Sequence, residues 1–212
     1  SPNNDLNGNA AGIVYVVTPP ILAGDLNLST VATAKIYGEG ARHFAGSAMS
    51  SAGDINSDGY DDLLIGAYGD DTNGTDSGAG YLVMGPVSGD VYLSSAQARF
   101  FGEDDEDFAG YSVAGNGDFN GDGIPDLMIG AYGEDTGAGD AGLIYVVFGD
   151  ATISGDQQLA NADVKLIGES TGDSAGYDLT FIDANGDGID DALIGAYGKD
   201  SNGFSANGSA YL

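Results

Sequence analysis

One stretch of sequence decides the fold: Asp118-Phe-Asn-Gly-Asp-Gly-Ile-Pro-Asp-Leu-Met-Ile-Gly-Ala-Tyr132. Closely similar stretches run from Asp54 to Tyr68 and from Asp183 to Tyr197. Successive copies begin 64 and 65 residues apart. An internal period of this length indicates a repeat architecture, in which each copy is one supersecondary unit.

Four short segments of strand character accompany each copy. In the middle repeat they lie at residues 110–117, 126–132, 142–148 and 162–167, and clusters of Gly, Asp, Asn and Ser separate them. No window shows a 3.6-residue apolar period, so antiparallel β-structure is favoured over helix. We therefore expect an all-β fold, a β-propeller of four-stranded antiparallel blades with strand A innermost and strand D outermost.

The phase of the repeats predicts how the chain is divided. We expect residues 1–39 to form strands C and D of a preceding blade, and residues 40–102 and 103–168 to form two blades. Residues 169–212 then form strands A and B and the start of strand C of a further blade. About three blades cannot close a ring, since propellers have roughly four to eight. Missing blades of a larger ring, or a second copy in a homo-oligomer, would complete it, and the redundant strand C favours the first alternative.

The composition excludes several classes of function. The 212 residues include 33 Asp and Glu against 5 Lys and Arg, which gives a formal net charge of −28. Nucleic acids and anionic membranes are bound through Lys and Arg, so neither is an expected partner. No apolar run approaches the ~20 residues of a membrane-spanning helix, so membrane insertion is not expected. Without Cys, thiolate metal sites and cysteine nucleophiles are impossible.

Oxygen-bearing side chains recur at fixed positions of the repeated stretch. Positions 1, 3, 5 and 9 are Asp, Asn, Asp and Asp in every copy, position 6 is Gly, and the backbone carbonyl of position 7 can add an oxygen. Such a loop wraps around one hard cation at ~2.3–2.6 Å. Oxygen ligands without His or Cys favour Ca²⁺ over Zn²⁺ or Cu²⁺, and Mg²⁺ seldom uses an all-protein cage. The expected ligands of three calcium sites, one per repeat, are Asp54, Asn56, Asp58, Tyr60 and Asp62, then Asp118, Asn120, Asp122, Ile124 and Asp126, then Asp183, Asn185, Asp187, Ile189 and Asp191.

Two other interpretations of these loops fit the sequence less well. An EF-hand needs Glu at position 12 and helices on both sides, but position 12 is Ile65, Ile129 and Ile194. The site is therefore expected in a β-hairpin. Turns chosen only for left-handed backbone angles would need one or two Asp, Asn or Gly residues per loop, not the same four oxygen positions three times.

These residues resemble the FG-GAP repeat of integrin α-subunit propellers and their bacterial relatives. The matching pieces are Phe-Ala-Gly at 44–46 and 108–110, Ser-Ala-Gly at 174–176, the three loops, and Gly-Ala-Tyr at 66–68, 130–132 and 195–197. Phe-Ala-Gly replaces the Phe-Gly of the family, and Tyr replaces its final Pro. The resemblance implies calcium hairpins between strands A and B on a lower face. The upper face would then carry the B–C loops (69–77, 133–140 and 198–207) and the D–A loops (39–43, 103–107 and 169–173).

The expected function is that of a calcium-binding extracellular or cell-surface propeller that mediates adhesion or molecular recognition through an unknown protein or glycan ligand on the upper face. Enzymatic activity is not expected, since candidate acid pairs repeat with the blade and His43, the one histidine, is expected to be an exposed surface residue. Tyr68, Tyr132 and Tyr197 either pack between blades or form an aromatic ring for a ligand. Two alternatives remain open: a structural building block of a surface layer or filament, and an accessory propeller of a secreted hydrolase.

Overall fold

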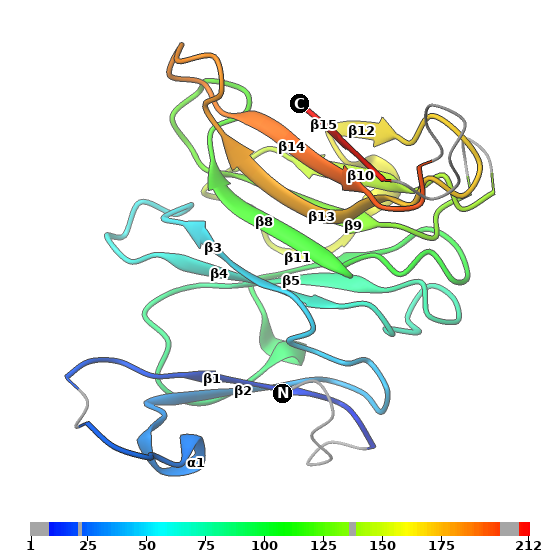
Figure 1. Cartoon of the computed structure of the whole chain (residues 1–212). Coiled ribbons are helices and arrows are strands. Elements are labelled where there is room, and N and C mark those ends of the chain that lie inside the picture. The colour runs from blue at the N-terminus through cyan, green and yellow to red at the C-terminus, as the bar shows by residue number, and fades with distance from the viewer. Residues whose placement is uncertain (1–8, 21–22, 136–138, 200–207) are drawn as a thin grey trace.

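The computed structural model describes residues 9–20, 23–135, 139–199 and 208–212, and these form an all-β structure (Figure 1). Four sheets follow one another along the molecule, with the N-terminal strands at one end and the C-terminal strands at the other. The helical elements of the described residues are three single turns: α1 (Leu28–Val31) and the 3-10 turns Leu93–Ser95 and Leu159–Asn161. The predicted all-β class with mostly antiparallel sheets is confirmed.

The sheets contain three, five, four and three strands. The first sheet has the order β1-β2-β6, from β1 (Ile13–Val16), β2 (Ala34–Tyr37) and β6 (Gly89–Tyr92). The second has the order β11-β7-β5-β4-β3, from β3 (Met49–Gly53), β4 (Asp62–Ala67), β5 (Ala79–Val83), β7 (Ala98–Phe101) and β11 (Gly155–Gln158). The third has the order β12-β10-β9-β8, from β8 (Ser112–Gly117), β9 (Asp126–Ala131), β10 (Leu143–Val147) and β12 (Val164–Ile167). The fourth has the order β13-β14-β15, from β13 (Ala175–Ile182), β14 (Asp191–Ala196) and β15 (Ser209–Tyr211).

Two strands join a neighbouring repeat instead of their own, which the sequence did not lead us to expect. Strand β6 lies between β5 and β7 in sequence but pairs in parallel with β2 of the preceding repeat. Strand β11 lies between β10 and β12 and pairs in parallel with β7 of the preceding repeat. We call β6 and β11 the latch strands. They make the sheets differ in strand number, so uniformly four-stranded units are not observed.

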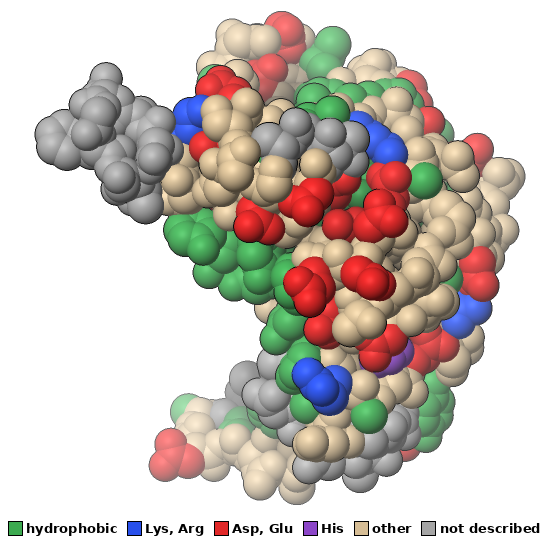
Figure 2. Space-filling view, turned by 90° about the vertical axis from the view of Figure 1, so that its right-hand side faces the viewer, with side chains coloured by type: hydrophobic (Ala, Val, Ile, Leu, Met, Phe, Trp, Pro, Cys, Tyr) green, Lys and Arg blue, Asp and Glu red, His purple; other side chains and the backbone are tan. Residues whose placement is uncertain are grey.

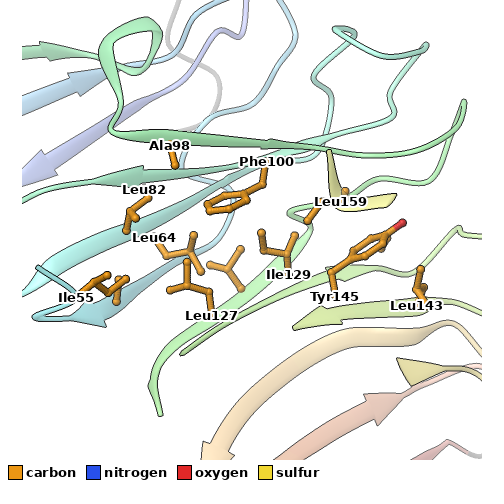
Figure 3. Close-up of a cluster of buried hydrophobic side chains, with 14 residues drawn as sticks. Ile55, Leu64, Leu82, Ala98, Phe100, Leu127, Ile129, Leu143, Tyr145 and Leu159 are labelled. Atoms are coloured by element: carbon orange, nitrogen blue, oxygen red, sulfur yellow. The ribbon is translucent and has the colours of Figure 1, made fainter. Parts of the chain in front are cut away.

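The core lies between neighbouring sheets. One cluster joins Leu64 and Leu82 of the second sheet to Leu127 and Ile129 of the third (Figure 3). The backbones approach closely at the join, because a Cβ on Gly66 would lie 2.0 Å from the carbonyl oxygen of Gly110. Glycine at this point therefore lets each sheet pack on the next.

The loops separate into two ends of the molecule. The hairpin loops β3–β4, β8–β9 and β13–β14 lie at one end, on the left of Figure 1, and the loops that follow β4, β9 and β12 lie at the other. This separation matches the lower and upper faces that the resemblance implied. In the space-filling view the molecule curves around a hollow on one side (Figure 2).

Candidate metal centre

Each repeated loop joins an edge strand of a sheet to its neighbour. The first loop connects β3 to β4, the second connects β8 to β9, and the third connects β13 to β14. The loop glycines at position 6 have φ of 91°, 86° and 86° at Gly59, Gly123 and Gly188. Glycine adopts this left-handed conformation without steric cost, so the chain can turn back toward its own preceding side chains.

The three loops share one hydrogen-bond pattern. In the first, the backbone N–H of Asp58 donates to the side-chain oxygens of Asp54 and Asn56, both at 2.9 Å. The N–H of Gly59 donates to Asp54 at 2.8 Å, and that of Tyr60 to Asp58 at 3.0 Å. The second and third loops repeat all four bonds at 2.8–3.2 Å. Positions 1, 3 and 5 of each loop are thus brought together with their oxygens turned into the loop.

Position 9 accepts hydrogen bonds of its own from the backbone, a role that the sequence did not reveal. Asp62 is fully buried, and its two oxygens accept the N–H of Ile55 at 3.1 Å and the N–H of Gly85 at 2.8 Å. Asp126 accepts the corresponding bonds from Phe119 and Gly149, both at 2.8 Å. In these two loops position 9 therefore fastens the loop to the end of the third strand of its repeat.

The third loop keeps part of this arrangement. Asp191 accepts the N–H of Ala184 at 3.1 Å and is only half-buried. Among the described residues, a glycine that follows the third strand donates to position 9 in the first two loops only, so Asp62 and Asp126 are the more firmly held. Each carboxylate oxygen has two lone pairs, and a single backbone bond to it leaves one for a further ligand.

Burial and the charges of the loop both act on the pKa of the carboxyl group at position 9. Burial raises the pKa of Asp62, the N–H groups of Gly85 and Ile55 lower it, and the carboxylates of Asp58 and Asp54 raise it again. Within the part of the chain that the structure describes, no three His, Cys, Asp or Glu side chains form a ready group for a metal ion. The donor chemistry of the loops nevertheless fits a hard cation, because every side-chain donor is a carboxylate or amide oxygen.

The second and third loops are linked to each other. The N–H of Asp118 donates to the carboxylate of Asp190 at 2.9 Å, and the N–H of Asp190 donates to the carbonyl oxygen of Asp118 at 3.0 Å. Position 1 of one loop is therefore tied to position 8 of the next. The role of Asp190 could not be predicted from the sequence, because position 8 is Asp, Pro and Asp in the three copies and shows no common pattern.

The upper face is acidic. Figure 2 shows Asp and Glu side chains gathered on it, and those that are exposed include Asp71, Asp104, Asp105, Glu106, Asp135 and Asp140. Residues 136–138 and 200–207 of the predicted upper loops lie outside the described residues. The prediction that His43 is an exposed residue is wrong: its side chain is 16% exposed and its Nδ1 lies 2.8 Å from the buried carboxylate of Asp70. That hydrogen bond raises the pKa of His43 against the opposing effect of burial.

Two of the three tyrosines that end the repeated stretch pack against the next repeat. The ring centroid of Tyr68 lies 5.6 Å from that of Tyr111, and Tyr132 lies 5.7 Å from Tyr177. Both also stack within their own repeat, Tyr68 on Phe44 at 5.0 Å and Tyr132 on Phe108 at 5.2 Å. Tyr197 contacts Tyr177 of its own repeat and is 56% exposed.

Comparison with known proteins identifies the repeat. Residues 45–83 and 109–147 match the model of the FG-GAP repeat. The chain carries FG-GAP repeats. The first matched segment contains β3, β4 and β5, and the second contains β8, β9 and β10, so each includes one of the candidate metal loops.

The FG-GAP repeats are similar to segments of integrin α subunits. Integrin alpha-2 of Bos taurus is 35% identical over 136 residues, which cover 62% of this chain and 11% of that protein. Integrin alpha-5 of Xenopus laevis is 32% identical over 127 residues, which cover 57% of this chain and 11% of that protein. Phosphatidylinositol-glycan-specific phospholipase D of Bos taurus is 34% identical over 162 residues, or 71% of this chain and 18% of that protein.

The chain therefore spans between 7% and 11% of the length of the integrin subunits that it matches first. None of the helices in the described residues is long and apolar enough to cross a membrane.

Proposed function

We propose that this chain is a calcium-binding extracellular β-propeller module that mediates adhesion or molecular recognition. The observation that carries the proposal is the hydrogen-bond pattern that holds positions 1, 3 and 5 of all three loops in the same arrangement. Turns that served only the backbone would not need three acidic or amide side chains oriented alike in every repeat. The similarity to integrin α subunits favours a recognition module.

Calcium would be held by the oxygens of positions 1, 3, 5 and 9 and by the carbonyl of position 7. When bound, it supplies positive charge that offsets the repulsion among the loop carboxylates. Binding to the folded loops and not to the unfolded chain stabilises the fold by RT ln(1 + [Ca²⁺]/Kd) for each site. With Kd between about 10⁻⁴ and 10⁻³ M, millimolar calcium contributes roughly 0.4–1.4 kcal/mol per site. Such sites are filled outside cells, which is why we place the module there.

The finer architecture belongs to the same proposal. We take the sheets as propeller blades, with residues 40–102 and 103–168 contributing two and residues 1–39 and 169–212 contributing parts of two more. The curvature of the molecule and the consecutive pairing of β8, β9, β10 and β12 support this division. Further blades or a second copy would complete the ring. The acidic upper face is the proposed contact for a protein or glycan ligand.

A second candidate function is that of an accessory propeller of a secreted hydrolase. Its support is the similarity to bovine phosphatidylinositol-glycan-specific phospholipase D, which covers a larger share of this chain than the integrin matches do. Catalysis would then belong to another part of the protein, since the candidate acidic residues here repeat with the loops. The calcium proposal is common to both candidates.

Thermal unfolding in calcium, magnesium and chelator tests the metal assignment. We expect calcium to raise the Tm by several degrees more than magnesium does. Asp122→Asn should remove about a third of that increase, and the triple variant Asp58→Asn, Asp122→Asn, Asp187→Asn should remove nearly all of it. Asp104→Asn makes the same charge change at an exposed position of the upper face and should keep the full increase. An equal response to magnesium, or a full calcium response in the triple variant, would show that these loops are not calcium sites.

Binding to a panel of immobilised extracellular-matrix proteins and glycans tests the recognition role. We expect the wild type to bind at least one member in calcium, and the triple variant to lose that binding under the same conditions. Failure of the folded, calcium-loaded chain to bind any member would argue against a recognition module while leaving the metal assignment intact.

A further inference from the structure

The outer edge of β12 breaks the pattern of the latch strands. β2 and β7 are the last strands of their repeats, and each is covered by a latch strand from the repeat that follows. β12 holds the same place in the third sheet. Among the described residues, no strand pairs with its outer edge. Its backbone donors and acceptors therefore form an open template for a further strand.

The side chain at the end of β12 is also more exposed than its counterparts in β2 and β7. Tyr37 of β2 and Phe101 of β7 are 9% and 2% exposed, whereas Ile167 at the matching position of β12 is 50% exposed. A groove of about 680 Å³ lies beside β12, and Leu166, Ile194 and Tyr211 are among the residues that line it. The third sheet thus lacks a covering that the first and second sheets have.

The two latch strands share a chemistry that defines what this edge accepts. Both read Gly-Asp-x-x-Leu, at 89–93 and 155–159, and both glycines have positive φ, of 69° and 72°. In the second latch, Asp156 pairs with Arg99 of β7 at 2.7 Å. The leucines that end the motif, Leu93 and Leu159, are 1% exposed. Figure 3 shows Leu159 in the region between Phe100 and Tyr145.

β12 and its groove offer the matching partners for such a segment. Lys165 occupies the position that Arg99 has in β7, because they face Tyr145 and Tyr81 at the same register. Leu166 and Tyr211 correspond to Phe100 and Tyr145 in the repeat, and both line the groove. If a Gly-Asp-x-x-Leu segment paired in parallel with β12, its Asp would lie beside Lys165 and its Leu would lie in the apolar groove.

A third segment of this kind is present, and it lies exposed. Gly24-Asp-Leu-Asn-Leu28 has the same spacing, Gly24 has a φ of 131°, and the helical turn α1 follows as 3-10 turns follow the two latches. Residues 23–30 are exposed throughout. Leu28 is 51% exposed, in contrast with the buried leucines of the latch strands. No strand in the described residues receives this segment.

We propose that residues 24–28 of a second copy of this chain bind the outer edge of β12 as a parallel latch strand, so that copies associate head to tail. Asp25 of the incoming copy pairs with Lys165, and its Leu28 fills the groove. The incoming β1 pairs with β14 in place of β15, since both are third strands of their repeats and β15 is held to β14 by only three residue pairs. Tyr15 of the incoming β1, which stands at the same repeat position as Tyr211, then takes the place of Tyr211 beside Leu28. The contact is heterologous: each copy offers one segment and one edge. It goes beyond the recognition function and does not depend on the calcium sites.

Two variants block the two halves of this contact. Leu28→Gln removes the apolar side chain that fills the groove. Its matched control is Leu26→Gln, because Gln157 stands at that position of the latch strand β11. Ile167→Pro removes a backbone donor from the outer edge. The N–H of Gly168 donates to the carbonyl oxygen of Gly142, the residue before β10, so the N–H of Ile167 faces the other side. Lys165→Glu is the alternative edge variant, which repels Asp25, should the proline lower the Tm.

Sedimentation velocity over a broad range of protein concentration measures the association, and far-ultraviolet circular dichroism and Tm check the fold of every variant. We expect the wild type and Leu26→Gln to reach at least twice the monomer mass, and Leu28→Gln and the edge variant to remain monomers. An equimolar mixture of those two variants should form a one-to-one dimer and nothing larger, because one retains the edge and the other the segment. A monomeric wild type, continued association of either blocked variant, or a mixture that stays monomeric would overturn the proposal.

Discussion

At the scale of the residue, equivalent buried positions of the three repeats differ in charge. His43 faces Asp70 at 2.8 Å in the first repeat, and Lys199 faces Asp173 at 2.9 Å in the third. The middle repeat has carboxylates at both positions, Asp107 and Glu134, which are 3% and 2% exposed. Burial, and then the charge of Glu134, raise the pKa of Asp107 to about 6, although the N–H of Asp104 acts in the opposite direction.

Asp107→Asn is therefore expected to stabilise the protein at neutral pH. The pKa of an unfolded Asp is about 3.9, so the folded chain binds the proton more tightly than the unfolded chain does. The resulting stability is fully present below about pH 4 and is lost as the pH rises through 6, which amounts to roughly 3 kcal/mol. The amide keeps an acceptor for the N–H of Asp104, which donates to Asp107 at 2.8 Å.

Urea unfolding from pH 4 to pH 8 checks this prediction. We expect Asp107→Asn to gain on the order of 1–3 kcal/mol at pH 7.5 and little at pH 4, with a flatter pH profile than the wild type. Asp25→Asn changes an exposed carboxylate of the first repeat, serves as the control and should follow the wild-type profile. Identical pH profiles for Asp107→Asn and the wild type would show that Asp107 does not carry the buried proton.

At the scale of the element, the latch strands bind each sheet to the one before it. Each is four residues long and pairs through its backbone, but the following leucine reaches the core between the sheets. Arg99 adds an ion pair at either side, with Glu39 at 2.9 Å and with Asp156 at 2.7 Å. The pairing of β11 with β7 thus combines main-chain bonds, one buried leucine and one cation, whereas Asp90 of β6 accepts a hydrogen bond from the hydroxyl of Tyr37 at 3.3 Å.

Truncation to Ala should lower the free energy of unfolding at Leu93 and Leu159, which are buried, but hardly at Leu28, which is exposed. Leu93→Ala and Leu159→Ala each leave a cavity in a packed core, so we expect a loss of about 2–5 kcal/mol. Leu28→Ala, at an exposed position, should cost less than about 0.5 kcal/mol in dilute protein. Chemical unfolding of the three variants at low concentration measures the difference. If Leu28→Ala lowered the free energy of unfolding as much as Leu159→Ala does, residues 24–28 would have to be packed in the core of the isolated chain.

The strands of the repeated stretch could be predicted because their apolar runs are continuous. The predicted strands 126–132 and 142–148 are β9 at Asp126–Ala131 and β10 at Leu143–Val147. The latch strands could not be predicted, because Gly155-Asp-Gln-Gln158 has no apolar alternation and its partner β7 lies in another repeat. A parallel partner that distant leaves no local pattern in either segment.

The candidate site was predictable in part for a similar reason. The spacing of positions 1, 3 and 5 places their oxygens in one turn, so the sequence alone brings Asp54, Asn56 and Asp58 together. The role of Asp62 depends on Gly85, which is 23 residues away, and no local spacing reveals that contact. His43 was misplaced because its exposure depends on Asp70, a partner from a different loop.

At the scale of the whole molecule, the net charge of −28 opposes compactness. Raising the salt concentration from about 10 mM to 150 mM shortens the Debye length from roughly 30 to 8 Å and weakens this repulsion. In chelator, we expect the Tm to rise by several degrees over that range. With calcium present the rise should be smaller, because bound cations already offset part of the loop charge.

Differential scanning calorimetry with sodium chloride and with choline chloride measures this effect and separates screening from binding of sodium. Similar increases in the two salts are the expected result. A Tm that stays constant or falls with salt in chelator would show that long-range repulsion does not limit the stability of this chain.

The crossing of β6 and β11 into preceding sheets has a practical consequence for dissecting the molecule. Cutting the chain at the borders of the sequence period would separate β6 and β11 from β2 and β7, the strands with which they pair. A single excised period would therefore expose one unpaired four-residue strand and one unpaired sheet edge. Recombinant fragments should instead contain both strands of such a pair, even though the two strands come from different periods. The interlocked pair of periods, and not the single period, is the smallest portion of this chain that can be expected to behave as an independent body.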